Sequence, residues 1–338
     1  MSGNNLLVED ARSALSGIVI DSLRGKKILV VGGSGLVGTH FLSCALEMQE
    51  RLEGQLSVET VVRHRIPPWM EPYRDRVTIR AGDATELDFL RRLEKFDIII
   101  HAATYGQPGL FTAQPKTTLR LNTVTTFALL DKLLDKGKFL FISSSEVYSG
   151  LADPPFVEAN IGTTGPQHPR ACYIEGKRCG ETICNSYRQD GIDAKSIRLS
   201  STYGPGVRRG DQRVLYQFID RALCSGKLEL LDAGTARRTF CYISDVGAMA
   251  WRILLTGREA VYNVGGIWRT SISNLARAIG DLTDSAVYAP PKSDDGLPGA
   301  MEDVQVDIGK YEREFGPHRF FDPSAGLART IEWCRGLV

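Results

Sequence analysis

The chain contains the stretch Lys27-Ile28-Leu29-Val30-Val31-Gly32-Gly33-Ser34-Gly35-Leu36-Val37-Gly38, in which an apolar run leads directly into a glycine-rich turn. The run is typical of a buried strand, and residues 39–49 continue with the pattern of a helix. Glycines at every third position let the backbone turn tightly and approach a pyrophosphate, whose charge the start of the helix would favour. The stretch therefore predicts a dinucleotide site, with a plain tight turn as the alternative. The expected contacts are Gly32, Gly35, Leu36, Val37 and Gly38.

The alternation of strand and helix continues along the chain. Apolar runs at 58–62, 77–79, 97–100, 139–142 and 194–198 are separated by helical stretches such as 117–136. Apolar strands of this kind are buried on both faces in parallel sheets. We therefore expect an α/β fold, a Rossmann doubly wound parallel sheet with a smaller C-terminal α/β substrate lobe.

The domain boundaries follow from where this alternation lapses, at about Tyr203. We expect a dinucleotide-binding Rossmann domain from 26–202 plus about 236–262, and a substrate lobe from about 203–235 plus 263–338. Residues 1–25 carry helically spaced apolar positions between 5 and 23, which predicts a helical extension. Packing on the main domain is its expected role, with a dimer arm as the alternative.

Composition limits the class of protein. Basic and acidic residues number 41 and 40 in a chain of 338, so there is no electrostatic case for nucleic acid or an anionic membrane as a partner. The sequence lacks an apolar run of about 18 residues, which a membrane-spanning helix requires. Seven scattered cysteines favour reduced thiols, and the first residues carry acids but no bases, unlike a signal peptide. A cytoplasmic location is expected, and we assign no metal site.

Three further segments at strand ends are candidates for the dinucleotide site. Arg63 follows the second strand, where an acidic residue often binds the ribose of NAD, so NADP stays open beside NAD. Asp83 and Ala84 follow the third strand and could meet the adenine, with a surface turn as the alternative. Ala102 and Ala103 end the fourth strand, where small side chains would line the dinucleotide.

Two later motifs carry groups suited to acid–base chemistry. Tyr173 and Lys177 are four residues apart and share one face of a helix, where an ammonium and a positive nicotinamide would favour the tyrosinate. The run Ser143-Ser144-Ser145-Glu146 follows the apolar segment 139–142, which places hydroxyls at the carboxyl end of a strand. Ligands of open α/β sheets bind at that edge. A Ser-rich turn without function is the alternative.

Together these motifs resemble the extended short-chain dehydrogenase/reductases, specifically the NAD-dependent epimerase/dehydratase family, whose members modify nucleotide sugars. The resemblance runs from about residue 26 to residue 334 and also includes segments 198–206, 238–245 and 262–266. Within the family, the chain resembles UDP-glucuronate decarboxylases, dTDP-glucose 4,6-dehydratases and UDP-glucose 4-epimerases. The resemblance implies NAD as a recycled cofactor, a nucleotide-diphosphate sugar as the substrate, and a homodimer.

The resemblance implies catalytic roles for five residues. Tyr173 matches the general base for a sugar hydroxyl, and Ser144 matches the catalytic Ser/Thr. Lys177 would bind the nicotinamide ribose and lower the pKa of the tyrosine. Ser145 and Glu146 occupy the positions of a second catalytic pair.

Binding residues are implied in the same way. Asn122 and Ser143 would contact the cofactor, while Ser201 and Arg209 would contact the substrate. Arg238 matches the arginine that pairs with the nucleotide diphosphate, with a structural salt bridge as the alternative.

Two departures from the family pattern weaken the expected diphosphate clamp. Ser201 stands where many relatives carry Asn, and Gly296-Leu297-Pro298-Gly299 replaces an arginine-containing run. Arg208, Arg209 or Arg213 could compensate, or could be surface residues.

The resemblance leaves the exact reaction open. The shared first step is oxidation of the sugar, usually at C4, and the second step makes the enzyme a lyase or an isomerase. Ser145-Glu146 is closer to the pair of the decarboxylases than to the Asp-Glu pair of the dehydratases, and 4-epimerases need no carboxylate there. Reactions that use Glu146 are slightly favoured, although Glu146 could instead cap the next helix or orient a loop. An NADPH-consuming ketoreductase and a non-catalytic dinucleotide-binding protein are the other hypotheses.

The homodimer expectation rests on the helix that bears Tyr173. This helix is expected to present Ile174, Cys179, Ile183 and Cys184 to a second subunit, because relatives pair the equivalent helices.

Overall fold

The computed structural model describes residues 3–63, 66–290 and 299–337. Within these residues, seven parallel strands form the main sheet in the order β10-β6-β5-β4-β1-β2-β3. The strands are β1 (Lys26–Val31), β2 (Leu56–Val62), β3 (Thr78–Ala81), β4 (Phe96–His101), β5 (Leu133–Ser144), β6 (Asp193–Leu199) and β10 (Val261–Val264). The strand order reverses direction between β1 and β4, which confirms the predicted Rossmann doubly wound sheet.

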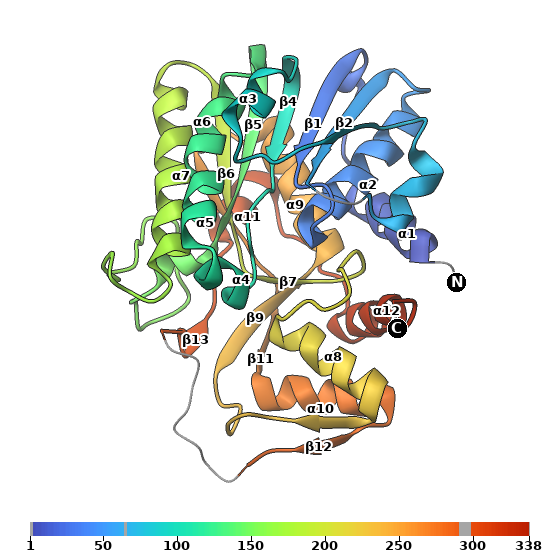
Figure 1. The fold of residues 1–338 in the computed structure, drawn as a ribbon, viewed down its shortest axis with the longest axis vertical. Helices are drawn as coiled ribbons and strands as arrows, with labels where there is room; N and C mark the ends of the chain where they lie inside the picture. The colour runs from blue at the N-terminus through green and yellow to red at the C-terminus, as the bar shows by residue number, and fades with distance from the viewer. Residues whose placement is uncertain (1–2, 64–65, 291–298, 338) are drawn as a thin grey trace.

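Helices cover both faces of this sheet (Figure 1). Successive residues of β1 point to opposite faces, so the strand packs against both layers of helices. Ile28 and Val30 pack with α2 (Leu36–Arg51) and α9 (Ile243–Thr256) on one face. Leu29 and Val31 pack with α6 (Val124–Leu130) and α7 (Ala171–Gln189) on the other. The remaining helices of this part are α3 (Leu87–Arg91), α4 (Pro108–Ala113), α5 (Pro115–Asn122), α11 (Gly309–Phe315) and the short 3-10 helices η2 (Pro68–Tyr73) and η3 (Ser145–Tyr148).

A smaller lobe lies below the carboxyl edge of the main sheet in Figure 1. Its sheet combines β7 (Ser201–Tyr203), β9 (Arg237–Tyr242), β11 (Trp268–Ser271) and β13 (Asp303–Val304). A two-stranded sheet of β8 (Lys227–Glu229) and β12 (Ala286–Tyr288) lies with α8 (Val214–Ser225), α10 (Ile272–Thr283) and α12 (Pro323–Arg335).

The structure differs in detail from the predicted domain boundaries, which themselves stay a prediction. Strand β9 belongs to the smaller sheet, although about 236–262 was expected in the Rossmann domain. Strand β10 completes the main sheet and extends to Val264, two residues beyond the predicted end. The chain therefore returns to the main sheet later than the sequence pattern indicates, at β10 and not at β9.

The N-terminal extension forms helix α1 (Gly3–Ala14), shorter than the predicted 5–23, followed by the 3-10 helix η1 (Asp21–Leu23). Leu6, Leu7 and Ala11 are buried in the same hydrophobic cluster as α2 and α9. The buried Asp10 accepts hydrogen bonds from Tyr242 and Arg329, which tie α1 to the smaller sheet and to α12. The extension thus packs on its own subunit.

Helix α7 does not present most of the residues that were expected to face a second subunit. Ile174, Ile183 and Cys184 are buried inside the subunit at 4% exposure or less, and of the four expected contact residues Cys179 is the one that is exposed. The sequence pattern alone did not distinguish the core face of α7 from its outer face. Within the described parts of the chain, every helix is too short or too polar to span a bilayer.

Candidate active site

The glycine-rich turn between β1 and α2 is packed too tightly for side chains. Gly32 has a φ of +91°, and a Cβ there would lie 2.8 Å from the Cα of Ala103. A Cβ on Gly38 would lie 2.1 Å from the carbonyl oxygen of Gly32, whereas one on Gly35 would meet only that oxygen, at 3.6 Å. The turn is also fixed to β4, since Ala102 N donates to Val31 O at 2.9 Å. Leu36 and Val37 form the first turn of α2.

The residues predicted to contact the adenine and its ribose lie at the ends of the neighbouring strands. Asp83 Oδ1 accepts hydrogen bonds of 2.8 Å from both the amide and the hydroxyl of Thr85, so this carboxylate shapes the turn after β3. Ala84 is buried, and its carbonyl accepts from Thr125. Arg63 donates to the hydroxyl of Tyr105 at 2.5 Å. The next two residues in the sequence, His64 and Arg65, lie outside the described residues.

Ser144 and Tyr173 meet where β5 ends and α7 begins. The Ser144 hydroxyl lies near enough to the phenol of Tyr173 to affect its pKa, and the Tyr173 ring stacks on Phe111 of α4 with 4.6 Å between ring centroids. Burial raises the pKa of Tyr173 to about 12, the neighbouring Ser144 hydroxyl opposes this rise, and the charge of Glu146 adds to it. The protein alone therefore keeps the phenol protonated, and the expected tyrosinate requires a further positive charge such as a nicotinamide.

Lys177 lies one turn further along α7 in a buried position. Its Nζ donates to the carbonyl of Ile142 at 2.5 Å and lies 4.7 Å from the ring centroid of Phe141. Burial lowers the pKa of Lys177 to about 7, against the opposing charge of Glu181. An ammonium has three donors, so Lys177 can bind a further acceptor such as a ribose hydroxyl.

Glu146 pairs with the guanidinium of Arg170 and lies within electrostatic reach of Arg238. Its Oε1 accepts from Arg170 Nη2 at 2.5 Å. Burial raises the pKa of Glu146, while the charges of Arg170, Arg238 and His168 oppose the rise. The cap of η3 comes from Ser144, whose Oγ accepts from Glu146 N, so the carboxylate of Glu146 is not the capping group. Ser145 is buried in the same turn.

Sequence reasoning missed Arg170. It precedes α7 directly and lies three residues before Tyr173, and this helical spacing was the signal that could have identified it. Its guanidinium lies 5.3 Å from the ring centroid of Phe111, the ring on which Tyr173 stacks. Arg170 thus connects the tyrosine with the carboxylate of Glu146.

The predicted substrate residues are spread over the smaller lobe. Arg238 is close enough to Glu146 and Arg170 for their charges to affect its pKa, which burial lowers, and its Nη1 donates to the carbonyl of Arg237 at 2.7 Å. Ser201 is half-buried in β7, and Arg209 is exposed. Arg213 pairs with Asp211, and its charge acts on Tyr173. Residues 296–298 of the altered glycine–proline run lie outside the described residues.

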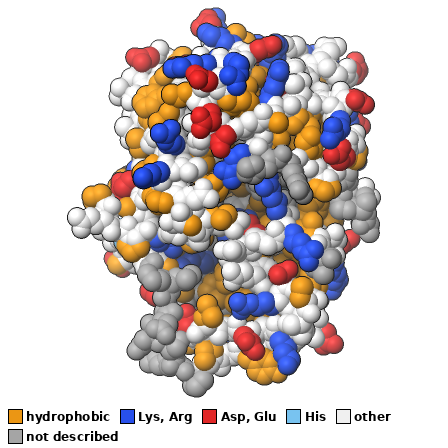
Figure 2. Space-filling view, in the orientation of Figure 1, with side chains coloured by type: hydrophobic (Ala, Val, Ile, Leu, Met, Phe, Trp, Pro, Cys, Tyr) orange, Lys and Arg blue, Asp and Glu red, His pale blue; other side chains and the backbone are white. Residues whose placement is uncertain are grey.

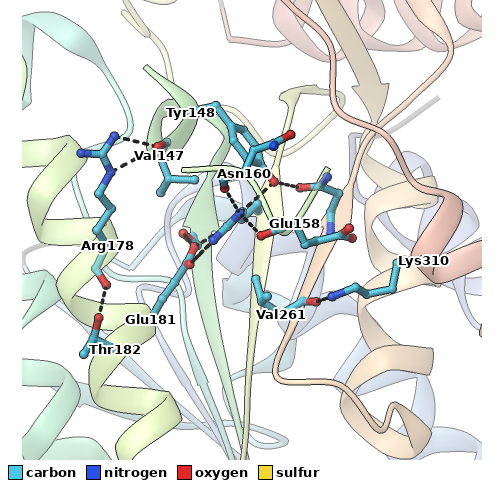
Figure 3. A network of polar contacts seen from close by, with 12 residues as sticks. Val147, Tyr148, Glu158, Asn160, Arg178, Glu181, Thr182, Val261 and Lys310 are labelled. Carbon is cyan, nitrogen blue, oxygen red and sulfur yellow. Dashed lines mark hydrogen bonds and ion pairs between the residues drawn. The ribbon is translucent and has the colours of Figure 1, made fainter. Parts of the chain in front are cut away.

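A network of polar side chains from β6, α7, η3 and β10 lies next to the carboxyl end of β5 (Figure 3). Arg198 of β6 pairs with Glu181 of α7 at 2.8 Å and donates to the hydroxyl of Tyr148 at 2.9 Å. Tyr148 in turn donates to Asn263 of β10 at 2.7 Å. Ser143, a predicted cofactor contact, donates to Glu181 at 2.5 Å, so its hydroxyl faces this network. The pairing of Arg198 depends on tertiary packing and was not predicted.

The residues at this edge fit a dinucleotide. The glycine turn offers backbone amides without side chains, and Lys177 has donors to spare. Asn122 is buried against Gly176 of α7, and its Oδ1 has no hydrogen-bond partner among the described residues. Figure 2 shows Lys and Arg side chains gathered around the hollow between the two lobes, as binding of a phosphorylated molecule requires.

Comparisons with known proteins agree with this geometry. The sequence model of the NAD dependent epimerase/dehydratase family matches residues 28–265. UDP-glucuronic acid decarboxylase 1 of Xenopus tropicalis is 30% identical over 315 residues, which cover 92% of this chain and 72% of the relative. UDP-glucuronic acid decarboxylase 6 of Arabidopsis thaliana is 30% identical over 294 residues, covering 86% and 83%. The structure of MoeE5 in complex with UDP-glucuronic acid and NAD superposes with a TM-score of 0.75 at 24% identity, covering 92% and 100%.

Proposed function

This chain belongs to the NAD-dependent epimerase/dehydratase family, and we propose that it decarboxylates a nucleotide-linked hexuronic acid through transient oxidation of the sugar. The observation that carries the proposal is a cluster of positive charge at Glu146: Arg170 forms an ion pair with it, and the charge of Arg238 also acts on it. The charge of Arg170 acts on Tyr173 as well. Guanidinium groups bind carboxylates bidentately, so this cluster suits a sugar that carries a carboxylate. The two curated relatives described above are both UDP-glucuronic acid decarboxylases.

In the proposed reaction, Tyr173 takes the proton of the C4 hydroxyl, and the neighbouring Ser144 hydroxyl lowers the pKa of the phenol. Bound NAD supplies reversible hydride acceptance at C4. The C5–C6 bond then breaks, carbon dioxide leaves, and the electron pair moves toward the C4 ketone to give an enolate. Glu146, whose pKa is raised by burial, donates a proton to C5. Tyr173 returns its proton to the C4 oxygen when the ketone is reduced.

Arg170 has two partners in this scheme. Without substrate it holds Glu146 through the 2.5 Å ion pair. A uronate carboxylate competes for the same guanidinium, which would release Glu146 to take up the proton it later donates. Arg238 adds a second positive charge to the substrate side of the cluster.

The test is product analysis by mass spectrometry and NMR after incubation with NAD and either UDP-glucuronic acid or UDP-glucose. We expect a UDP-pentose and one carbon dioxide from the uronate, and no product from UDP-glucose. A 4-keto-6-deoxy sugar from UDP-glucose would make the protein a dehydratase, and a C4 epimer would make it an epimerase. Either result would overturn the proposal.

We also propose a homodimer. Its support is an exposed apolar group on α5 and α6, formed by Leu119, Val124 and Phe127, of which Phe127 is 48% exposed. Phe127 lies against Tyr187 of α7, with 6.2 Å between ring centroids, so the group extends along the face where α7 also lies. Sedimentation should give a dimer mass that Phe127→Asp reduces to that of a monomer. A wild-type monomer at all concentrations would refute the proposal.

A cytoplasmic location is proposed on the state of the thiols. All seven cysteines, each within the described residues, are unpaired, as is typical of a reducing compartment.

A further inference from the structure

Two arginines from distant segments lie beside the glycine turn. Arg63 follows β2, and Gly32 N donates to Val61 O of that strand at 3.2 Å, which places the end of β2 next to the turn. Arg208 comes from the loop after β7, and its Nε donates to the carbonyl of Ser34 inside the turn at 2.6 Å. The two cations therefore border the turn from the Rossmann side and from the smaller lobe.

The position of each guanidinium is defined by its contacts. Arg63 Nη1 donates to Tyr105 OH at 2.5 Å, and its guanidinium carbon lies 5.4 Å from the centroid of that ring. Burial lowers the pKa of Arg208, and the charge of Arg63 lowers it further, so the two groups are within electrostatic reach. Arg208 has no ion pair with any acid among the described residues. Such a like-charge pair is stabilised by an anion between its members.

The acids nearby are already engaged. Glu59, the acid of β2, is buried and pairs with Arg80 at 3.0 Å. Asp83 holds the amide and hydroxyl of Thr85. Neither is placed like the carboxylate at the end of the second strand that hydrogen-bonds the ribose 2′-hydroxyl of NAD in Rossmann folds.

We propose that Arg63 and Arg208 bind the 2′-phosphate of a 2′-phosphorylated dinucleotide, so that the protein accepts NADP as well as NAD. An arginine near the end of the second strand accommodates this phosphate in Rossmann folds, and the guanidinium fork matches the phosphate oxygens. An enzyme that returns the hydride to its own substrate consumes neither cofactor, so acceptance of both is compatible with the proposed reaction.

The test is calorimetric titration of the cofactor-free protein with NAD and with NADP. The wild type should bind NADP at least as tightly as NAD. Arg63→Ala and Arg208→Ala should each weaken NADP binding about tenfold while changing NAD binding less than about twofold, because only the charge-assisted bonds to the 2′-phosphate are lost. Arg63→Asp, which supplies a ribose acceptor, should bind NAD more tightly than NADP.

Arg91→Ala is the matched control. Arg91 is an exposed arginine of α3, paired with Asp88, and its removal changes the net charge by the same amount. Thermal melting of each variant would show that the fold persists. Equal weakening of NAD and NADP by Arg63→Ala would assign Arg63 to the adenine or the pyrophosphate and overturn the inference, as would a wild type that prefers NAD tenfold. Either failure concerns the cofactor alone and leaves the decarboxylation, assayed with NAD, untouched.

Discussion

The ring of Tyr173 stacks on Phe111, and its phenol lies near the hydroxyl of Ser144. Tyr173→Phe removes the phenolic oxygen and keeps the stacked ring, so the fold and NAD binding should persist. General bases contribute about 10²–10⁴-fold, and turnover should fall by at least that factor. The control is Tyr187→Phe, a change on the same helix as Tyr173. It removes a hydroxyl that donates to Asp131 and should leave turnover unchanged. Near-normal turnover in Tyr173→Phe would remove this tyrosine from the mechanism.

Glu146 is predicted to act after the oxidation. Glu146→Gln keeps the shape of the side chain but can neither pair ionically with Arg170 nor donate a carboxyl proton. Transient NADH absorbance should persist in a single turnover, while release of the final sugar slows by about 10²-fold or more. Glu175→Gln, the same change at a partly exposed residue of α7 paired with Arg178, should behave as wild type. Unchanged product formation in Glu146→Gln would leave Glu146 with a structural role.

For single residues, the Tyr–Lys spacing, the serine run at a strand end and the family resemblance predicted a site at Ser144, Tyr173, Lys177 and Glu146. The structure places these residues where β5 ends and α7 begins. The sequence did not identify Arg170 as the partner of Glu146 or Arg198 as the partner of Glu181. Each of these pairs joins segments at least 17 residues apart, and only packing brings the charges together.

Among the elements, the turn between β1 and α2 makes the sharpest structural prediction. Gly38→Ala places a Cβ 2.1 Å from the carbonyl oxygen of Gly32, so backbone must move, and both thermal stability and NAD binding should fall. Gly35→Ala is the matched control for stability, because its Cβ meets only one backbone atom, at 3.6 Å, and its φ of −84° suits alanine. Equal melting temperatures for Gly38→Ala and the wild type would contradict the packing described for this turn.

Helix α1 carries a carboxyl group that should make stability depend on pH. Burial raises the pKa of Asp10 to about 6, from an ordinary value of 3.8, against the charge of Arg329. The carboxyl of Asp10 therefore stays protonated to a higher pH in the native state than in the unfolded state. The stabilisation that results from this difference is lost as pH rises between about 4 and 6. The side chain of Asn in Asp10→Asn does not titrate. The free energy of unfolding of this variant, relative to that of the wild type, should therefore rise by about 2 kcal/mol from pH ~4 to pH ~7. Urea unfolding at both pH values measures this, and a pH-independent difference would exclude the effect.

The positions of strands and helices were easier to predict from the sequence than the sheet to which each strand belongs. The strand–turn–helix of residues 26–51 lies where the apolar run and the glycines place it, because both signals are local. Strand β9 was expected in the Rossmann domain but pairs with β7, β11 and β13, since pairing partners depend on the path of the chain between lobes. The extension was expected to be helical to residue 23, and its helix ends at Ala14 before Gly17, which has a φ of +68°.

In the whole molecule, the two sheets contribute different residues to the candidate site. The parallel sheet places the glycine turn, Ser144 and the start of α7 at one edge, and the smaller lobe brings Arg238 and Arg213 to the same edge. The doubly wound sheet and the family membership were predicted from the sequence and are confirmed. The arrangement of charges between the lobes became visible only in three dimensions, since it joins residues from 146 to 238.

Hydride return at C4 is tested most directly with UDP-glucuronic acid that carries deuterium at C4, incubated with the protein and a catalytic amount of NAD. Mass spectrometry and NMR would locate the deuterium, and absorbance would report the redox state of the cofactor. We predict many turnovers per NAD, a pentose product that keeps deuterium at C4, and cofactor that is oxidised at the end. Deuterium lost from the sugar and found in one equivalent of reduced cofactor, or product formed without NAD, would contradict transient oxidation with internal return.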